Sequence, residues 1–351
     1  FTRLRILVCG GDGTVSWIIS TLEKMNLKRK WPPIAVLPLG TGNDLARIHG
    51  WGGGYNNESL IGILEQVTES YTSLLDRWEM TIEDSKGKVK EVKSFFNYLG
   101  VGADAQAALQ VHYLRESRPA WFFSRLVNKA WYGIFGAEDI VKATSVNVRK
   151  EITLFADGVE VPLPLASQGI IVLNIDSYAG GVPLWSHGFK GATVMPRHGR
   201  PRRSKSMSDF RKKRSGSMER FDSIDDIDAL LSEAEKFEQV TACEYPSSCQ
   251  DGVLEVVSIR GAFHLGQIKV GLSTAEKVCQ CREAKIVIKK KVAVQIDGEP
   301  WRQNTCTLNV KRKPDPAVML HRSADDGGVE TEMSKLLDWA EERKLVDGQV
   351  H

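Results

Sequence analysis

The sequence predicts an α/β domain followed by a mostly β domain, in a chain of 351 residues. Over residues 1–80, short apolar runs alternate with glycine-rich turns and with segments of helical spacing, a pattern typical of an α/β domain with a parallel sheet. Over residues 81–313, short runs rich in Val and Ile are bounded by Gly, Asp and Pro, which indicates a β-sandwich. A chain of this length can bury enough surface for both domains.

The elements of the first domain follow from its apolar spacing. The continuous apolar run Leu4–Cys9 ends in glycines and predicts a buried parallel strand, and Ile34–Leu37 predicts a second one. Apolar residues recur at helical intervals within Val15–Met25. Two further helices are expected at Asp44–His49 and Ser59–Glu69, so that strands and helices alternate along the chain.

The second domain is predicted from a series of short strands with one helical stretch, Ala103–Asn128, between the early ones. The predicted strands are Phe95–Leu99, Val146–Phe155, Gly169–Ile175, Val253–Ile259, Ala284–Lys289 and Val292–Ile296.

Residues 195–240 are expected to be a disordered insertion in this domain. Nine Lys or Arg lie between Arg197 and Arg214, and eight acids follow between Glu219 and Glu238. The basic half, 197–214, is a candidate for docking on anionic lipid, and a solvated linker with no role is the alternative. Ser206 and Ser217 each follow an arginine by three residues, a context that suits protein kinases. Residues 314–351 are predicted to form a polar, partly helical tail.

Composition narrows the class of protein. The formal net charge of +3 is close to balance and argues against a nucleic-acid binder. The 6 cysteines form no pair of CxxC motifs, so a zinc site is not predicted and a reducing, cytoplasmic location is expected. No apolar run approaches the roughly 18 residues that span a bilayer. We therefore expect any lipid to be reached from the water side, at the membrane periphery.

The first glycine-rich turn follows a predicted strand and precedes a helix. It consists of Gly10, Gly11, Asp12, Gly13 and Thr14. Glycines let backbone N–H groups approach a phosphate, and the helix N-terminus favours an anion. The Asp12 carboxylate is placed to hold Mg²⁺ on those phosphates. A plain tight turn is the alternative, but three glycines with Asp and Thr favour phosphate binding.

The second turn, PLGTGND at 38–44, lies in the same context and has no Walker lysine. Its predicted ATP-binding residues are Gly40, Thr41, Gly42, Asn43 and Asp44, with Thr41 and Asn43 as hydrogen-bond donors to phosphate. Helix capping alone is the alternative for Asp44. Because both turns follow neighbouring strands at their carboxyl ends, they are expected to face one crevice.

Further motifs follow downstream of the two turns. They are LDRW at 75–78, FNYLGVGAD at 96–104, FSR at 123–125 with NK at 128–129, VLNIDSYAGG at 172–181, DGVLEVV at 251–257 and QIDGEPW at 295–301. Together with these motifs, the two turns resemble the diacylglycerol kinase family. The first turn alone also resembles NAD kinases, phosphofructokinases and sphingosine kinases, but the order and spacing of all the motifs are specific. The family's first strand and first phosphate turn are expected upstream of Phe1.

The resemblance implies a phosphofructokinase-like α/β nucleotide domain and a β-sandwich accessory domain, with ATP and Mg²⁺ as cofactors. It implies an enzyme that phosphorylates diacylglycerol to phosphatidic acid in lipid signalling, with Glu299 as general base. A solvated hairpin turn is the alternative for Asp297-Gly298-Glu299, since Asp-Gly is a common hairpin signal.

Three acids are metal candidates by the same resemblance. Asp12 and Asp76 are expected to hold Mg²⁺-ATP, and Asp251 resembles a position that binds a second Mg²⁺ in bacterial relatives. For Asp76 the alternatives are an ion pair with Arg77 or a helix cap, and for Asp251 a turn before a strand. Two other functions stay open: a non-catalytic nucleotide- or lipid-binding scaffold, and a kinase for another lipid alcohol such as a sphingoid base.

Overall fold

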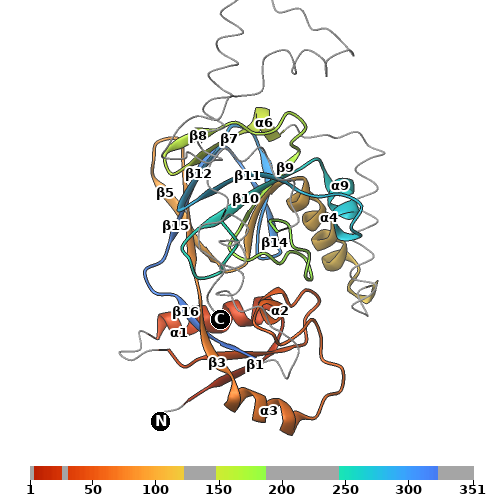
Figure 1. Ribbon diagram of the computed structural model, residues 1–351. Coiled ribbons are helices and arrows are strands. Elements are labelled where there is room, and N and C mark those ends of the chain that lie inside the picture. The colour runs from red at the N-terminus through yellow and green to blue at the C-terminus, as the bar shows by residue number, and fades with distance from the viewer. Residues whose placement is uncertain (1–3, 26–30, 122–147, 187–244, 323–351) are drawn as a thin grey trace, which may run out of the picture.

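The computed structural model describes residues 4–25, 31–121, 148–186 and 245–322 (Figure 1). The predicted insertion 195–240, with Ser206, Ser217 and the basic stretch 197–214, lies outside the described residues. So do the end of the helical stretch beyond 121 and the chain beyond 322.

The α/β character predicted for the first part is confirmed by a four-stranded sheet with the order β1-β2-β16-β3. β1 and β2 are parallel, with Ile6 opposite Ile34, and β16 is parallel to β2 and antiparallel to β3. Figure 1 shows α1 and α2 on the side of this sheet that faces the larger sheets, and α3 on the other side. The elements are β1 (Ile6–Gly10), α1 (Asp12–Lys24), β2 (Ile34–Pro38), α2 (Asp44–Ile48), α3 (Leu60–Glu69), β3 (Tyr71–Leu75) and β16 (Ala317–His321).

The predicted polar tail is wrong for residues 317–321. They form β16, a central strand whose Ala317, Met319 and Leu320 are fully buried. Charged residues on both sides of this five-residue run hide its apolar character in any longer window. The chain therefore leaves the sheet after Leu75 and returns to it from Arg312, the last residue of the other sheets.

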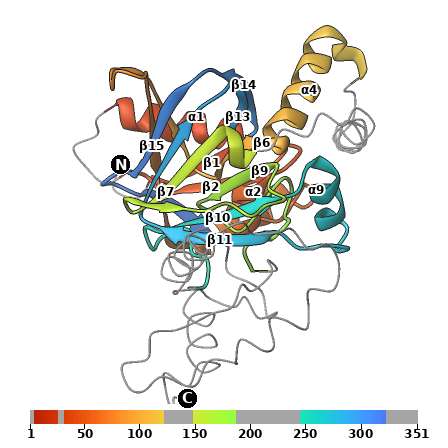
Figure 2. The ribbon, with the colours of Figure 1, turned by 90° about the horizontal axis from the view of Figure 1, so that it is seen from above.

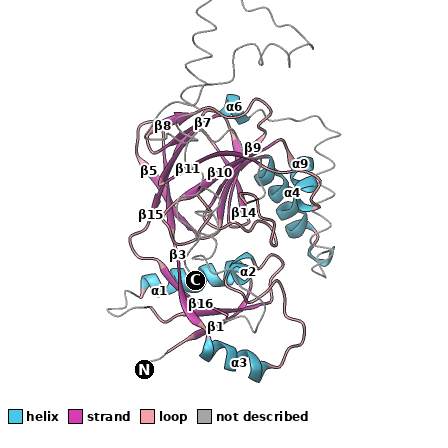
Figure 3. Cartoon of the chain, in the orientation of Figure 1, coloured by secondary structure: helices cyan, strands magenta, loops and turns pink. Residues whose placement is uncertain are grey.

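The second part contains two six-stranded sheets, ordered β11-β10-β9-β6-β13-β14 and β5-β4-β15-β12-β7-β8. All strand pairs within them are antiparallel. Figure 3 shows these strands stacked above the α/β part. The strands are β4 (Trp78–Glu83), β5 (Val89–Phe95), β6 (Tyr98–Gly102), β7 (Ile152–Ala156), β8 (Val159–Val161), β9 (Gly169–Leu173), β10 (Leu254–Ile259), β11 (Glu276–Cys281), β12 (Glu283–Ile288), β13 (Val292–Ile296), β14 (Glu299–Gln303) and β15 (Cys306–Arg312).

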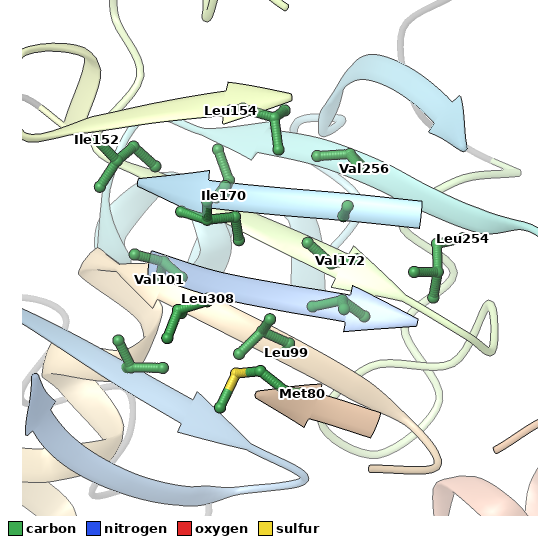
Figure 4. Close-up of a cluster of buried hydrophobic side chains, with 14 of the residues drawn as sticks. Met80, Leu99, Val101, Ile152, Leu154, Ile170, Val172, Leu254, Val256 and Leu308 are labelled. Carbon is green, nitrogen blue, oxygen red and sulfur yellow. The ribbon is translucent and has the colours of Figure 1, made fainter. Parts of the chain in front are cut away.

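One hydrophobic cluster takes alternate residues from both six-stranded sheets (Figure 4). Leu99, Val172 and Val256 contribute from the first sheet, and Met80 and Leu154 from the second. Period-two alternation places one face of each sheet in this cluster. The opposite face of β9 and β10 packs against α9 in a second cluster, so these strands are buried on both faces, and α4 lies beside α9 (Figure 2). The helices of this part are α4 (Ala103–Ser117), η1 (Pro119–Trp121), α6 (Val148–Glu151) and α9 (Ala262–Lys269).

Candidate active site

The two glycine-rich turns meet through their backbones. A Cβ built on Gly11 would lie 2.9 Å from the Cα of Gly40, and a Cβ on Gly40 would lie 2.5 Å from the Cα of Gly11. The Leu39 N–H also donates to the Gly10 carbonyl at 3.0 Å. Only glycine allows this approach. The structure thus brings the two predicted turns together at the carboxyl edge of β1 and β2.

The Asp12 carboxylate connects the first turn to the helix after the second. Its Oδ2 accepts from the Asp44 N–H at 3.0 Å and its Oδ1 from the Leu45 N–H at 2.8 Å. These N–H groups belong to the first turn of α2, where a carboxylate is favoured. Burial raises the pKa of Asp12 and nearby Asp44 raises it further, although backbone N–H groups lower it. The side chain that caps α2 is therefore Asp12. Capping of this helix by Asp44 was the alternative prediction for Asp44.

The Asp44 carboxylate joins the nucleotide turns to the second part of the chain. Its Oδ1 accepts from the Ser177 hydroxyl at 2.6 Å, from the Gly180 N–H at 3.0 Å and from the Gly181 N–H at 2.9 Å. The side chain is almost fully buried. Asp44 therefore fixes the loop after β9 against α2, a role that the sequence analysis did not predict.

Asn43 shapes the second turn. It is the N-cap of α2 in a left-handed conformation, with a φ of 57°. Its amide donates to the carbonyls of Gly40 at 2.9 Å and Gly53 at 3.0 Å, so both amide hydrogens are used. The predicted donation from Asn43 to phosphate is therefore not available in this arrangement.

The two threonines keep their hydroxyls available. Thr14 is exposed and Thr41 half-buried, and neither hydroxyl has a hydrogen-bond partner within the described residues. Gly13 is also exposed, and a Cβ there would meet open space. Gly42 is enclosed instead, because its Cβ would lie 3.1 Å from Asp44 Oδ2 and 3.3 Å from Asp12 Oδ2. The open side of the turns is thus lined by Gly13 and the threonines.

Glu299 lies beside the tip of a two-residue hairpin. Asp297 and Gly298 connect β13 to β14 with φ values of 48° and 88°, as in a type I′ turn. The Asp297 carboxylate accepts from the N–H groups of Phe96, Asn97 and Tyr98 at 2.9–3.0 Å. The hairpin alternative therefore describes the backbone correctly, and the exposed Glu299 side chain follows it as the first residue of β14.

The hairpin tip lies near the first turn. Burial raises the pKa of Asp297 to about 7 against its three N–H donors, and the Asp12 carboxylate also raises it. The Asp44 carboxylate thus raises the pKa of Asp12, and the Asp12 carboxylate raises the pKa of Asp297. None of the three acids makes an ion pair within the described part of the chain. The excess negative charge at this place suits a bound cation.

Asp76 has a different environment, which favours the ion-pair alternative over the metal role predicted for it. Its Oδ1 accepts from Arg312 Nε at 2.8 Å and Nη2 at 2.7 Å, and its Oδ2 accepts from the Gly252 N–H at 2.6 Å. Asp76 does form an ion pair, as the alternative predicted, but its partner is Arg312 and not Arg77. Arg77 instead pairs with Glu23 at 3.2 Å and stacks on Trp31 at 4.4 Å.

Asp251 forms the turn that was its alternative. The exposed side chain accepts from the Val253 N–H at 2.9 Å, and Gly252 has a φ of 72°. Among the residues that the structure describes, no group of three His, Cys, Asp or Glu side chains is placed to hold a metal ion.

Two further residues were not predicted: Arg47 beside the second turn, and Asp104 in the second part of the chain. The Arg47 guanidinium lies between Gly53 and Gly181, from different loops, although it stands in the recognised motif PLGTGNDLAR. Asp104, at the start of α4, accepts from Gln295 Nε2 at 2.6 Å, and burial raises its pKa to about 6. Neither residue differs in type or spacing from an ordinary helix residue.

Two family models match the chain. Residues 2–75 match the diacylglycerol kinase catalytic domain, and residues 94–300 match the diacylglycerol kinase accessory domain. The chain belongs to the diacylglycerol kinase family.

Named relatives agree with this assignment. The chain is 35% identical over 352 residues to diacylglycerol kinase 1 of Arabidopsis thaliana, covering 98% of this chain and 41% of that protein. It is 35% identical over 331 residues to diacylglycerol kinase 2 of the same organism, covering 92% and 39%. The chain thus spans about two fifths of these relatives.

A solved diacylglycerol kinase structure from Bacillus anthracis str. Sterne aligns with a TM-score of 0.45 at 13% identity, covering 90% of this chain and 75% of that one. Within the described residues, no helix has the length and apolarity needed to cross a membrane.

Proposed function

We propose that this chain is the catalytic region of an ATP-dependent kinase that phosphorylates 1,2-diacylglycerol to phosphatidic acid at a membrane surface. The observation that carries the proposal is the match to the catalytic and accessory domains of the family. The two glycine-rich turns of the catalytic domain converge on acids that have no cation partner among the described residues. Phosphoryl transfer depends mainly on positioning and charge neutralisation. Both requirements suit this edge of the sheet.

ATP would bind along the open side of the two turns. The backbone from Gly10 to Gly13 and from Gly40 to Gly42 would face the phosphates, with the free hydroxyls of Thr14 and Thr41 as donors. The Asp44 N–H is already used by Asp12. Asp12 fits Mg²⁺, because the backbone N–H groups of Asn43, Asp44 and Leu45 do not use all the lone pairs of its two carboxylate oxygens. Nucleotide Mg²⁺ needs only one or two protein carboxylates, and it would neutralise charge on the phosphates.

Glu299 would act as the general base. The lipid hydroxyl would give its proton to the Glu299 carboxylate while its oxygen bonds to the γ-phosphorus and the bond to the ADP oxygen breaks. Asp297 would position this residue, since its hydrogen bonds to Phe96, Asn97 and Tyr98 hold the hairpin tip. The tip lies near Asp12, on the side where the phosphates are expected.

The finer fold assignment is also a proposal. The α/β part would be phosphofructokinase-like, and the two six-stranded sheets would form the β-sandwich accessory domain. The shared hydrophobic cluster supports a sandwich, because alternate residues of both sheets enter it. Docking of 197–214 on anionic lipid and phosphorylation at Ser206 and Ser217 stay predictions.

The test is transfer of labelled γ-phosphate from Mg²⁺-ATP to diacylglycerol in mixed micelles, with the whole protein. Glu299→Gln is expected to lower the rate by about 10² or more. Glu160→Gln, an exposed glutamate of β8, is the control and should match the wild type.

The same assay separates the other functions. A wild type that binds ATP but phosphorylates no lipid would establish the scaffold instead. Faster transfer to a sphingoid base than to diacylglycerol would identify the sphingoid base as the preferred substrate. A full rate for Glu299→Gln would remove Glu299 from the reaction and leave the kinase assignment intact.

A further inference from the structure

The positively charged Arg47 side chain has no acidic partner within the described residues. It lies in α2, one turn after Asn43, and its Nε donates to the Gly42 carbonyl at 3.2 Å. It makes no ion pair and no other hydrogen bond within the described residues. A guanidinium has five N–H donors in a planar fork, so four of them are unused by the described part of the protein.

Glycines from two loops fix the position of this guanidinium. A Cβ on Gly53 would lie 2.0 Å from Arg47 Nη2, and a Cβ on Gly181 would lie 3.0 Å from Nη1. Any side chain at either position would displace the guanidinium. Gly181 has a φ of 103°, and its N–H is held by the Asp44 carboxylate. Asp44 therefore positions one wall of the slot that holds Arg47.

The slot adjoins the phosphate-binding turns. Gly42 contacts Arg47 through its carbonyl, and its Cα side faces Asp12 and Asp44. The guanidinium thus contacts the second turn through Gly42 and lies beside the loop that contains Gly181. A planar fork held in this way suits bidentate recognition of a phosphoryl group.

We propose that the terminal N–H groups of Arg47 bind phosphoryl oxygens in this cleft. The phosphoryl group belongs either to the triphosphate of ATP or to the phosphate monoester of the lipid product. The choice of these ligands rests on the proposed function, whereas anion binding by Arg47 does not.

Direct binding measurements on the whole protein test the proposal. The probes are a non-hydrolysable ATP analogue with Mg²⁺, AMP, inorganic pyrophosphate and a short-chain phosphatidic acid. Arg47→Gln should weaken at least one phosphoryl ligand by about 10- to 100-fold, as expected for a charge-assisted hydrogen bond. Arg47→Lys should recover part of the loss. Arg282→Gln, an exposed arginine between β11 and β12, is the matched control.

The pattern of losses identifies the ligand. A triphosphate contact weakens the ATP analogue and leaves phosphatidic acid unchanged, and a product contact does the reverse. AMP should be unaffected if the contact is beyond the α-phosphate. If the wild type phosphorylates no lipid, the proposed function fails, and pyrophosphate binding alone still tests Arg47.

Gly53→Ala provides a second test that keeps the charge. The three heavy atoms nearest to its Cβ all belong to the flexible end of Arg47, so the fold should persist while the guanidinium moves. We expect weaker binding of the same ligand that Arg47→Gln affects. The proposal is overturned if both variants bind every probe within twofold of the wild type. Should Arg47→Gln fail to fold, Gly53→Ala decides.

Discussion

Two groups of acids near the junction between the α/β part and the six-stranded sheets differ in their charge partners. Asp76 has a guanidinium and a backbone N–H on its carboxylate, and its charge is balanced within the chain. Asp12 and Asp44 accept hydrogen bonds from backbone and hydroxyl groups only, with Asp297 nearby. The first carboxylate stabilises the junction, and the second group has charge left for a ligand.

This comparison separates structural from functional acids more clearly than residue type does. Both groups lie in recognised motifs, in the turn or loop that follows a strand, so their sequences suggest the same role. A buried carboxylate is costly unless it is paired, and an internal cation removes the need for an external one. The absence of an ion pair at Asp12 within the described residues is therefore informative.

The largest expected effect is on catalysis at Asp12. Asp12→Asn should lower the rate of lipid phosphorylation by about 10² to 10³, the size of effect seen when one electrostatic contact in a transition state is lost. The folded state should lose about 1 kcal/mol, because one acceptor for the α2 N–H groups is removed. Kinase assays and urea unfolding measure the two effects. A rate near that of the wild type would place Asp12 with the structural acids.

The same substitution at Asp76 should affect stability strongly and the catalytic rate only weakly. Asp76→Asn removes the charge partner of Arg312 and should lower the free energy of unfolding by about 2–3 kcal/mol. This is less than for a fully buried pair, because the Arg312 side chain is 41% exposed and can rehydrate. The rate of the folded enzyme should change by less than about threefold. A loss of Mg²⁺-ATP affinity without loss of stability would reverse the comparison.

Asp104 is a third kind of acid, because no cation and no other acid acts on its carboxylate within the described residues. Its folded-state pKa of about 6 is above the unfolded value, so the folded state binds more protons and loses stability as pH rises from about 4 to 6. Asp104→Asn removes this dependence. The variant should gain about 1–3 kcal/mol relative to the wild type between pH 4 and pH 7.5, measured by urea unfolding. A constant difference across this range would mean that Asp104 is ionised normally.

The smallest effect is expected at Glu23, the exposed end of the junction. Burial raises its pKa, but Lys313 and Arg77 outweigh this and the pKa is lowered. The stabilisation that the Glu23 ion pairs provide is therefore complete above the pKa of Glu23 in the unfolded state. It is lost as the pH falls through the lower pKa of the folded state. Glu23→Gln should destabilise by about 1 kcal/mol at pH 7 and by nothing near pH 3. Glu65→Gln, an exposed α3 residue without an ion pair in the described region, is the control.

Sequence reasoning succeeded where local pattern determines structure. The strand before each glycine-rich turn, the helix after it and the contact between the turns follow from spacing and from the geometry of parallel strands. The partner of Asp76 could not be predicted, since Arg312 is 236 residues away in the chain. A carboxylate next to Arg77 suggests a local pair, but neighbouring side chains of an extended segment point in opposite directions.

The contacts of Asp44 and Arg47 were missed for a related reason. Both depend on how the loop around Gly181 folds back onto α2, which is a property of the tertiary structure. The motifs placed these residues in the correct segments, but which atoms come into contact depends on the tertiary structure. The two serines of the insertion lie outside the described residues and stay predictions.

The position of β16 has a consequence for how the protein forms during synthesis. β3 pairs only with β16 among the described strands, and β16 separates it from β2. The ribosome therefore releases β1, β2 and β3 long before the strand that unites them, and the α/β sheet cannot close until residue 321 has emerged. Contacts this distant slow folding and leave strand edges exposed meanwhile. The strands of both six-stranded sheets lie inside this interval, so all of them emerge before the α/β sheet can close.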